Sequence, residues 1–465
     1  MNGLPVSKLV PGAAALLGAA ALALWLTAGH GVEVAVRVPR EGGSHSQPQG
    51  LARPLEESGE LARGEGRPAD LPGAWPGFRG PDRDNVSKED LSLARQWPQG
   101  GPPRLWSVAL GEGYAGPAVL RGRVYVLDYD EERQADAYRC LSLADGRELW
   151  RFSYPVRIKP QHGISRTVVA TTDQFVVGMG PLCHVTCLDA TSGERQWAID
   201  LMEDYHTQVP RWYTGQCPLI DQGRAILAPG GDALMIAVQC ASGEVLWKTP
   251  NPQGWQMTHS SVMPVEFAGR RMFVYCASGG VVGVSAEDGT LLWSFPEWRI
   301  PTANIPSPLP VGDGRLFLSG GYRAGSMMIR LSDEDGELRA RKLFKLEPRV
   351  FGSEQQTPIL YQGHIYGVRP NGELVCLDLD GQVVWASGRE HRFGLGPYLV
   401  ADGLLFVMND KGLLTVAVAS PEGYQPLDQA QVLDGQSSWG PMALAGGRLL
   451  VRDLTTMACL DVRRR

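Results

Sequence analysis

The sequence repeats one short element eight times, and this repetition constrains the fold more than any other feature. Each copy is a turn residue followed by a run of β-branched, aromatic and aliphatic residues, and successive copies begin 40 to 51 residues apart. The eight copies begin at Gly122, Asp173, Gly223, Gly269, Gly314, Gly363, Gly403 and Gly447. A period of this size, with several short strands in each copy, is typical of a β-propeller in which each copy forms one blade.

Two further features recur with the same period. A proline precedes the turn in seven of the eight copies, as at Pro117, Pro218 and Pro358. Proline cannot donate to a strand ladder, so it indicates an edge strand, which in a propeller blade is the innermost strand. A turn pair followed by a tryptophan, as in SGERQW ending at Trp197, closes five of the blades, whereas the fifth copy, DGELRARKLF from Asp335, has lost the tryptophan.

The two ends of the repeat region complement each other. The eighth copy has no closing hairpin, and the chain stops one strand short after CLDVRRR. PPRLWSVAL, with Trp106, lies before the first copy and resembles an outermost strand without a blade. We expect this strand to complete the last blade, because a closed ring leaves no free sheet edge. The sequence therefore predicts an all-β, eight-bladed propeller over residues 75–465, with an open solenoid of hairpins as the alternative.

The N-terminal region predicts a membrane attachment. Residues 9–26 are 18 uncharged, apolar residues that follow Lys8, slightly fewer than the roughly 20 that span a bilayer and more than the core of a typical signal peptide. We expect residues 1–30 to form an uncleaved single-pass anchor in the inner membrane, with the propeller in the periplasm; a cleaved signal peptide is the alternative. Residues 31–74 have no aromatic residue and are rich in Gly, Pro, Glu and Arg, which predicts a disordered linker.

Charge and cysteine content exclude some functions. A net charge of −6 without a basic stripe argues against nucleic-acid binding. Cys140, Cys187, Cys376 and Cys459 are each followed by Leu at equivalent places in different blades, too far apart for disulfides. We interpret the cysteines as small apolar strand residues, and the sequence predicts no metal site.

One strand-and-hairpin segment, CLDATSGERQW from Cys187 to Trp197, resembles the pyrroloquinoline-quinone-like propeller repeat. WPGFRGPDRDNVS, from Trp75 to Ser87, is similar to the lead-in of bacterial exported members of this group. The resemblance implies the propeller fold with the repeat tryptophan docked between neighbouring blades. The group includes quinoprotein dehydrogenases and non-enzymatic relatives, such as the propeller lipoprotein of the outer-membrane barrel-assembly machinery. Related alcohol dehydrogenases typically carry a Cys-Cys disulfide beside the quinone and in some cases a C-x-x-C-H haem site, and this sequence has neither motif.

The loops that lead into the innermost strands converge on the axis, so the residues before the prolines should form a ring at the channel mouth. The members of this ring are Tyr114, His162, Arg166, Arg211, Trp212, Tyr213, Gln216, Trp255, His259, Asn304, Glu354, Gln355, Arg392, Phe393, Ser438 and Trp439. Aromatic, amide and cationic groups suit a planar ligand or an anion. One Glu and one Asn in separate blades leave a calcium–quinone site incomplete. Packing that simply plugs the channel is the alternative to ligand binding.

The sequence therefore predicts a non-catalytic, monomeric scaffold that binds a protein or a ligand at the membrane or cell envelope without a cofactor. The alternative is a dehydrogenase that uses pyrroloquinoline quinone and calcium to oxidise an alcohol or sugar. A small-ligand sensor is a third reading.

Overall fold

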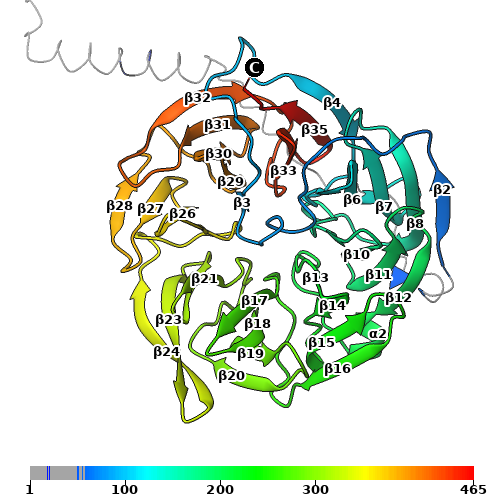
Figure 1. The fold of residues 1–465 in the computed structure, drawn as a ribbon, viewed down its shortest axis with the longest axis vertical. Helices are drawn as coiled ribbons and strands as arrows, with labels where there is room; N and C mark the ends of the chain where they lie inside the picture. The colour runs from blue at the N-terminus through cyan, green and yellow to red at the C-terminus, as the bar shows by residue number, and fades with distance from the viewer. Residues whose placement is uncertain (1–17, 19, 21–49, 52–54, 56–57, 465) are drawn as a thin grey trace, which may run out of the picture. The chain divides into compact units, whose positions relative to one another are not determined.

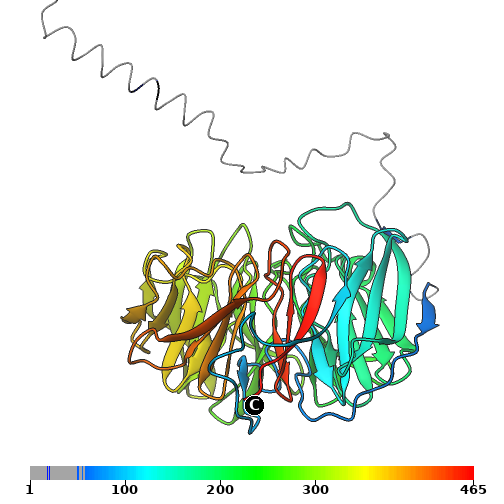
Figure 2. The same cartoon turned by 90° about the horizontal axis from the view of Figure 1, so that it is seen from above.

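Eight sheets surround a central axis in the computed structural model of the chain, which describes residues 18, 20, 50–51, 55 and 58–464 (Figure 1). Seven of the sheets contain the four consecutive strands of one repeat, ordered from the axis to the rim, and the last contains three such strands and one strand from before the repeats. Figure 2 shows the ring edge-on. We number these blades 1 to 8 in chain order. The predicted eight-bladed propeller is confirmed.

The strands of each blade follow one another in the chain, except where an N-terminal strand joins. Blade 1 comprises β5 (Ala118–Leu120), β6 (Arg123–Asp130), β7 (Ala135–Ser142) and β8 (Glu148–Arg157), and blade 2 comprises β9 (Ala170–Thr171), β10 (Phe175–Met179), β11 (His184–Asp189) and β12 (Arg195–Asp200). Blade 3 comprises β13 (Leu219–Asp221), β14 (Arg224–Leu227), β15 (Ala233–Gln239) and β16 (Val245–Pro250). Blade 4 comprises β17 (Met263–Phe267), β18 (Arg270–Ala277), β19 (Gly280–Ser285) and β20 (Leu291–Phe295). A short helix, α2 (Leu201–Tyr205), follows β12.

Blades 5 to 8 follow the same order. Blade 5 comprises β21 (Leu309–Gly312), β22 (Arg315–Gly320), β23 (Gly325–Glu334) and β24 (Glu337–Leu346), and blade 6 comprises β25 (Ile359–Tyr361), β26 (His364–Val368), β27 (Leu374–Leu377) and β28 (Val383–Ala386). Blade 7 comprises β29 (Tyr398–Ala401), β30 (Leu404–Met408), β31 (Leu413–Val418) and β32 (Pro426–Gln431). Blade 8 comprises β33 (Ala443–Ala445), β34 (Arg448–Arg452), β35 (Thr456–Asp461) and β4 (Arg104–Ala109). The other N-terminal strands are β1 (Gly50–Leu51), β2 (Glu60–Arg63) and β3 (Val86–Ser87).

The early strand β4 closes the ring, as the sequence predicts. It pairs antiparallel with β35, with Trp106 opposite Cys459. The Trp106 side chain is buried at 8% exposure, and its Nε1 donates to the Leu143 carbonyl of blade 1 at 3.0 Å. One residue therefore holds the outermost strand of blade 8 against both its own sheet and the next blade.

The repeat tryptophans lie between neighbouring blades. Trp150 of blade 1 packs against Gly193 in the outer turn of blade 2, where a Cβ atom would come within 2.6 Å of the indole. Gly193 also has φ 75°, a left-handed conformation that favours glycine. The Ser-Gly and Asp-Gly turns thus provide both the hairpin bend and the flat surface that receives the ring.

The predicted disordered linker is wrong for residues 58–74, which lie on the propeller. β2 adds to the outer edge of β8, with Ala62 opposite Arg151, and the Gly64 amide donates to the Leu149 carbonyl at 2.9 Å. A polar, glycine-rich segment cannot build a core of its own, but an existing sheet edge supplies the missing hydrogen-bond partners. The propeller unit therefore begins before residue 75.

The predicted anchor at residues 9–26 lies outside the described residues, apart from Gly18 and Ala20. The same holds for most of the predicted linker before residue 58. In the part of the chain that the structure describes, no helix is both long enough and apolar enough to cross a membrane.

The lead-in segment, residues 75–95, runs along one face of the ring and enters the channel (blue in Figure 2). Trp75 exchanges two backbone hydrogen bonds of 2.7 Å with Val119 of β5. β3 then pairs in parallel with β29, so the sheet of blade 7 gains a fifth strand on its axial side. The lead-in segment is therefore a strap that joins blade 1 to blade 7, on either side of blade 8.

A buried carboxyl group in blade 1 predicts a pH-dependent stability. Asp136 of β7 is 0% exposed and accepts a 2.8 Å hydrogen bond from the Tyr154 hydroxyl. Burial raises the pKa of Asp136 to about 7, against about 3.9 for an unfolded aspartate. The folded protein therefore holds this proton more tightly, and its stabilising effect is complete below about pH 4 and is lost as the pH rises through 7.

We expect the free energy of unfolding of the wild-type chain to fall by about 2–3 kcal/mol between pH 5 and pH 8, relative to that of Asp136→Asn. Urea titrations at both pH values measure this difference. His184, whose pKa burial lowers to about 4, acts in the opposite direction but is present in both proteins. Parallel pH profiles of the two proteins would contradict the prediction.

Candidate functional site

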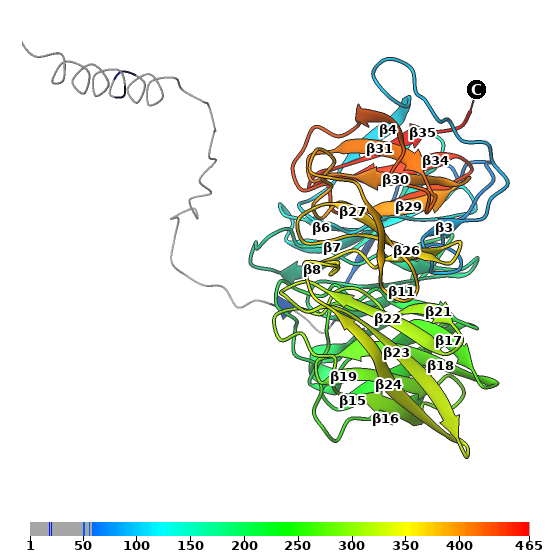
Figure 3. The ribbon, with the colours of Figure 1, turned by 90° about the vertical axis from the view of Figure 1, so that its left-hand side faces the viewer.

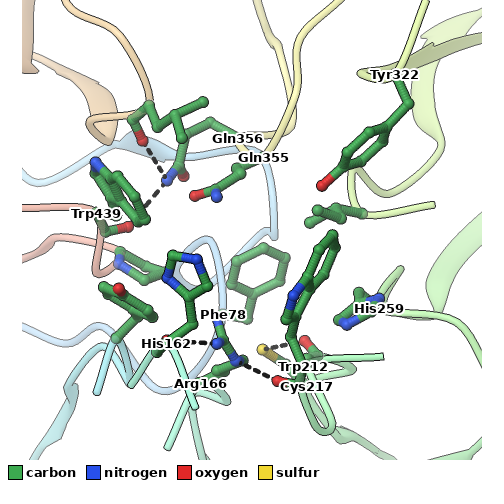
Figure 4. A pocket seen from close by; sticks show the side chains of 15 residues that line it. Phe78, His162, Arg166, Trp212, Cys217, His259, Tyr322, Gln355, Gln356 and Trp439 are labelled. Atoms are coloured by element: carbon green, nitrogen blue, oxygen red, sulfur yellow. Dashed lines mark hydrogen bonds between the residues drawn. The ribbon is translucent and has the colours of Figure 1, made fainter. Parts of the chain in front are cut away.

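A cavity of about 270 Å³ lies on the propeller axis, and every blade contributes to its wall (Figure 4). Its lining comprises Phe78, Tyr114, His162, Arg166, Trp212, Gly215, Cys217, His259, Ile305, Tyr322, Gln355, Gln356, Leu395, Trp439 and Pro441. Most of these residues come from the loops that lead into the innermost strands. Part of the predicted ring therefore lines a cavity, which is not filled completely by its own side chains.

Two pairs of aromatic rings form opposite walls of the axial cavity. Tyr114 and Trp439 stack with their centroids 5.2 Å apart and their planes 27° apart. Trp212 and Tyr322 stack at 6.1 Å and 22°. Figure 4 shows Trp439 on one side of the cavity and Trp212 with Tyr322 on the other. A planar or apolar group entering between the walls would meet aromatic faces on both sides.

Arg166 uses most of its hydrogen-bond donors to hold the loops of the cavity wall, which leaves few for a ligand. Its Nε donates to the Trp212 carbonyl at 2.6 Å, and its Nη2 donates to the His162 and Gly163 carbonyls at 2.6 and 3.2 Å. The guanidinium carbon also lies 5.0 Å from the centre of the Tyr114 ring. Burial lowers the pKa of Arg166 to about 10, so it remains a cation at neutral pH. Most of its donors already bind the protein's own backbone.

His259 is neutral in the folded protein. Its Nε2 lies 2.8 Å from the Arg211 carbonyl, which can only accept, so Nε2 carries the proton. Burial, followed by the nearby charge of Arg166, lowers the pKa of His259 to about 4. At neutral pH the cavity therefore presents aromatic and amide surfaces with one largely occupied cation.

Three of the lining residues have an unusual backbone conformation. His162, Trp212 and Tyr322 have φ values of 53°, 65° and 55°, in the left-handed region. For residues other than glycine this conformation costs about 1–3 kcal/mol each and persists where the surrounding structure imposes it. Such strain gathers at binding and switch sites, so its presence in the cavity wall favours a functional role.

The structure brings together seven of the sixteen residues of the ring predicted from the sequence. Those that line the axial cavity are Tyr114, His162, Arg166, Trp212, His259, Gln355 and Trp439. The nine that do not line it are Arg211, Tyr213, Gln216, Trp255, Asn304, Glu354, Arg392, Phe393 and Ser438.

Five of the nine predicted ring residues outside the axial cavity show what surrounds them instead. Arg211 lies over the Trp212 ring at 4.9 Å, Tyr213 donates from its hydroxyl to the Lys159 carbonyl, and Asn304 is buried. Trp255 packs against Gly279, and half-buried Glu354 lines a separate cavity of about 140 Å³, where burial raises the pKa of its carboxyl. Adjacent residues of one loop therefore differ in their surroundings, because Trp212 lines the cavity whereas Arg211 and Tyr213 do not.

Sequence reasoning missed eight of the fifteen lining residues, and two of these, both aromatic, lie outside the loops that lead into the innermost strands. Tyr322 lies in the loop between β22 and β23, and Phe78 comes from the lead-in segment. In a four-stranded antiparallel blade, the loop between the second and third strands lies on the same face as the loop before the first. This rule could have identified Tyr322 as a cavity residue from the sequence. No local sequence signal predicts that Phe78 lines the cavity.

The cavity does not fit a calcium-bound quinone. Calcium takes six to eight oxygen ligands, commonly including Asp or Glu carboxylates. Among the described residues that line the axial cavity, none is Asp or Glu, and the nearest candidate from the sequence, Glu354, faces the separate cavity. The side chains that the axial cavity offers are aromatic rings, amides, two histidines and one arginine.

Comparisons with known proteins point to one family and to a wider fold. A family model described as outer membrane protein assembly factor BamB matches residues 182–420. The outer membrane protein assembly factor BamB of Moranella endobia (strain PCIT) is 21% identical over 267 residues, which are 54% of this chain and 63% of the relative. The chain thus matches less than two thirds of the length of this relative.

Three solved structures share the fold. BamB from Moraxella catarrhalis matches with a TM-score of 0.53 and 14% identity, over 77% of this chain and 99% of that chain. A europium-containing methanol dehydrogenase matches with a TM-score of 0.60 and 13% identity, over 82% and 89%. The quinohemoprotein alcohol dehydrogenase ADHIIG from Pseudomonas putida HK5 matches with 0.58 and 13%, over 84% and 80%. At these identities the likeness shows the propeller fold alone.

Proposed function

Because the chain belongs to the family of the outer membrane protein assembly factor BamB, we propose that it is a non-catalytic propeller scaffold that binds a protein partner of outer-membrane assembly. The observation that carries this proposal is the family match across residues 182–420, which span the blades from the second to the seventh. The apolar residues 9–26 support a single anchor in the inner membrane, with the propeller in the periplasm.

The axial cavity is the part of the scaffold that we expect to contact the partner. Its volume of about 270 Å³ lies just below the roughly 300–1,000 Å³ of typical small-molecule sites. Opposed aromatic walls and a neutral His259 suit an apolar or aromatic side chain better than a cofactor with several charges. A projecting side chain of the partner would enter between Trp212 and Trp439.

Affinity purification of the tagged full chain from solubilised envelopes of its source bacterium tests this proposal. We expect an outer-membrane assembly protein to co-purify in near-equal amount, and the yield to fall at least about tenfold for Trp212→Ala combined with Trp439→Ala, as for a buried aromatic anchor at an interface. Trp255→Ala is the matched control, because Trp255 comes from an equivalent loop and does not line the cavity.

Two results would contradict the proposal. Equal capture by the cavity variant and by wild type would remove the cavity from the interface. Dye reduction with an alcohol or sugar after addition of pyrroloquinoline quinone and calcium, abolished by Trp212→Ala, would favour the dehydrogenase instead.

A further inference from the structure

The outer hairpin of blade 5 extends further than that of the preceding blade. In blade 4 the β19–β20 ladder has one residue pair after the bulge, Val284 with Leu291. In blade 5 the β23–β24 ladder passes the same bulge and continues to Glu334 opposite Glu337. Figure 3 shows β24 as a long strand at the rim of the ring. This repeat lacks the closing tryptophan, and Phe344 packs against Gly381 in its place.

Three arginines form one row across this blade. Arg315 of β22 lies directly opposite Arg330 of β23, and Arg330 lies directly opposite Arg341 of β24. Side chains paired in this way have Cβ atoms about 4.5–5.5 Å apart, and like charges at that spacing destabilise a sheet. A chain with a net charge of −6 therefore concentrates positive charge at this point.

The same row is neutral or balanced in other blades. Arg123 of blade 1 is opposite Ser142, and Arg448 of blade 8 is opposite Asp461. Of blades 1, 5 and 8, only blade 5 has a second arginine, Arg330, opposite the first. The longer hairpin of blade 5 then places a third arginine, Arg341, opposite Arg330.

Within the described part of the chain, Arg330 and Arg341 make no ion pair, and both are exposed. Arg315 has only Asp313 at 3.7 Å, and the Asp313 side chain is 79% exposed. Solvent-exposed pairs of this kind contribute little. The neighbouring Arg339 differs, because it pairs with Glu334 and Glu337. The positive row thus lacks the counter-charges that its neighbour has.

The row ends at an open sheet edge. β24 is the last strand of its sheet, and no other described strand pairs with its outer side. Leu343 sits at the bulge and is 40% exposed. The molecule itself shows that an outer blade edge accepts a further strand, because β2 pairs with the outer edge of β8 through four residue pairs. β24 is as long as β8, at 10 residues each.

We propose that the outer edge of β24 binds an extended acidic segment of a partner protein as an added strand, with a carboxylate placed opposite Arg341. The row Arg315–Arg330–Arg341 then continues into the added strand, where an opposite charge stabilises the pairing. This surface lies at the rim, so it is independent of the axial cavity and of the function proposed for it.

The experiment uses the full chain and a labelled synthetic peptide that alternates valine and glutamate, with glutamine in place of glutamate as the control peptide. We expect saturable binding by fluorescence anisotropy, weakened about tenfold by the glutamine peptide and by Arg330→Ser combined with Arg341→Ser, as the loss of two or three charge pairs implies. Arg389→Ser, which removes another exposed arginine, should leave binding unchanged. The double variant relieves a like-charge contact, so it should fold normally.

Hydrogen exchange identifies the mode of binding. A peptide added as a strand should slow exchange of backbone amides within residues 337–346. Unchanged exchange there, or equal weakening by Arg389→Ser, would overturn the proposal. So would arginine-dependent binding to vesicles containing phosphatidylglycerol without binding of the acidic peptide, because a lipid surface would then be the ligand.

Discussion

Replacing Trp106 with alanine should lower the free energy of unfolding of the whole chain by about 3–5 kcal/mol, the range measured for large aromatic residues removed from cores. The indole is buried between blades 8 and 1, where it packs against Gly146 and donates to the Leu143 carbonyl. Its loss leaves a cavity and weakens the pairing of β4 with β35, which closes the sheet of blade 8. Equilibrium urea unfolding measures the difference.

Leu105→Ala is the matched control for this variant. Leu105 is the preceding residue of the same strand and is 39% exposed, so its replacement should change the free energy of unfolding by no more than about 0.5 kcal/mol. Equal effects of the two substitutions would show that β4 contributes by backbone pairing alone. A negligible effect of Trp106→Ala would mean that the ring is stable without its closing contact.

Arg79→Met should produce a loss of similar size, about 3–5 kcal/mol, because buried carbonyls left without a donor cost about 1–3 kcal/mol each. Arg79 is 2% exposed, and its guanidinium donates to the carbonyls of Arg83, Asp84, Thr357 and Pro358 at 2.8 to 3.1 Å. The last two acceptors belong to blade 6. Methionine keeps most of the side-chain volume but none of the donors.

Arg83→Met provides the comparison within the same segment. Arg83 donates one hydrogen bond to the Ile220 carbonyl, at 2.9 Å, so we expect a loss of about 1 kcal/mol. Trypsin digestion gives a second readout, because release of the strap by Arg79→Met should expose Lys88 and Arg95 to cleavage before the blades unfold. Resistance equal to wild type would mean that other contacts hold the lead-in segment in the channel.

The ring and its closure were predictable because they depend on local signals that recur. The turn glycines, the prolines and the hairpin tryptophans specify each blade, and Trp106 could be matched to the missing strand of the eighth. The position of β2 could not be predicted in this way. Its residues form a strand only because β8 offers an unpaired edge, and the composition of a segment does not reveal which edge it will meet.

The candidate site was predicted by position but not residue by residue. The loops before the innermost strands do converge on the axis, yet Trp255 packs on Gly279 while Trp212 faces the cavity. The left-handed backbone at Trp212 and Tyr213 determines which side chain turns inward, and nothing in their sequence specifies that conformation. Predicting Tyr322 would have required the rule that the loop between the second and third strands of a blade lies on the same face as the loop before the first. Predicting Phe78 would have required knowing the path of the lead-in segment.

The pairing of β4 with β35 has a consequence for how the molecule is made. A polypeptide that emerges N-terminus first releases the strand containing Trp106 long before the one containing Cys459. During that interval the ring stays open between blades 8 and 1. The Trp106 indole and the unpaired edges of β4 and β35 remain exposed to non-native contacts. Contacts between residues so distant in sequence form slowly and favour aggregation. Efficient closure of the ring therefore requires that the early strand be shielded until the last one is made.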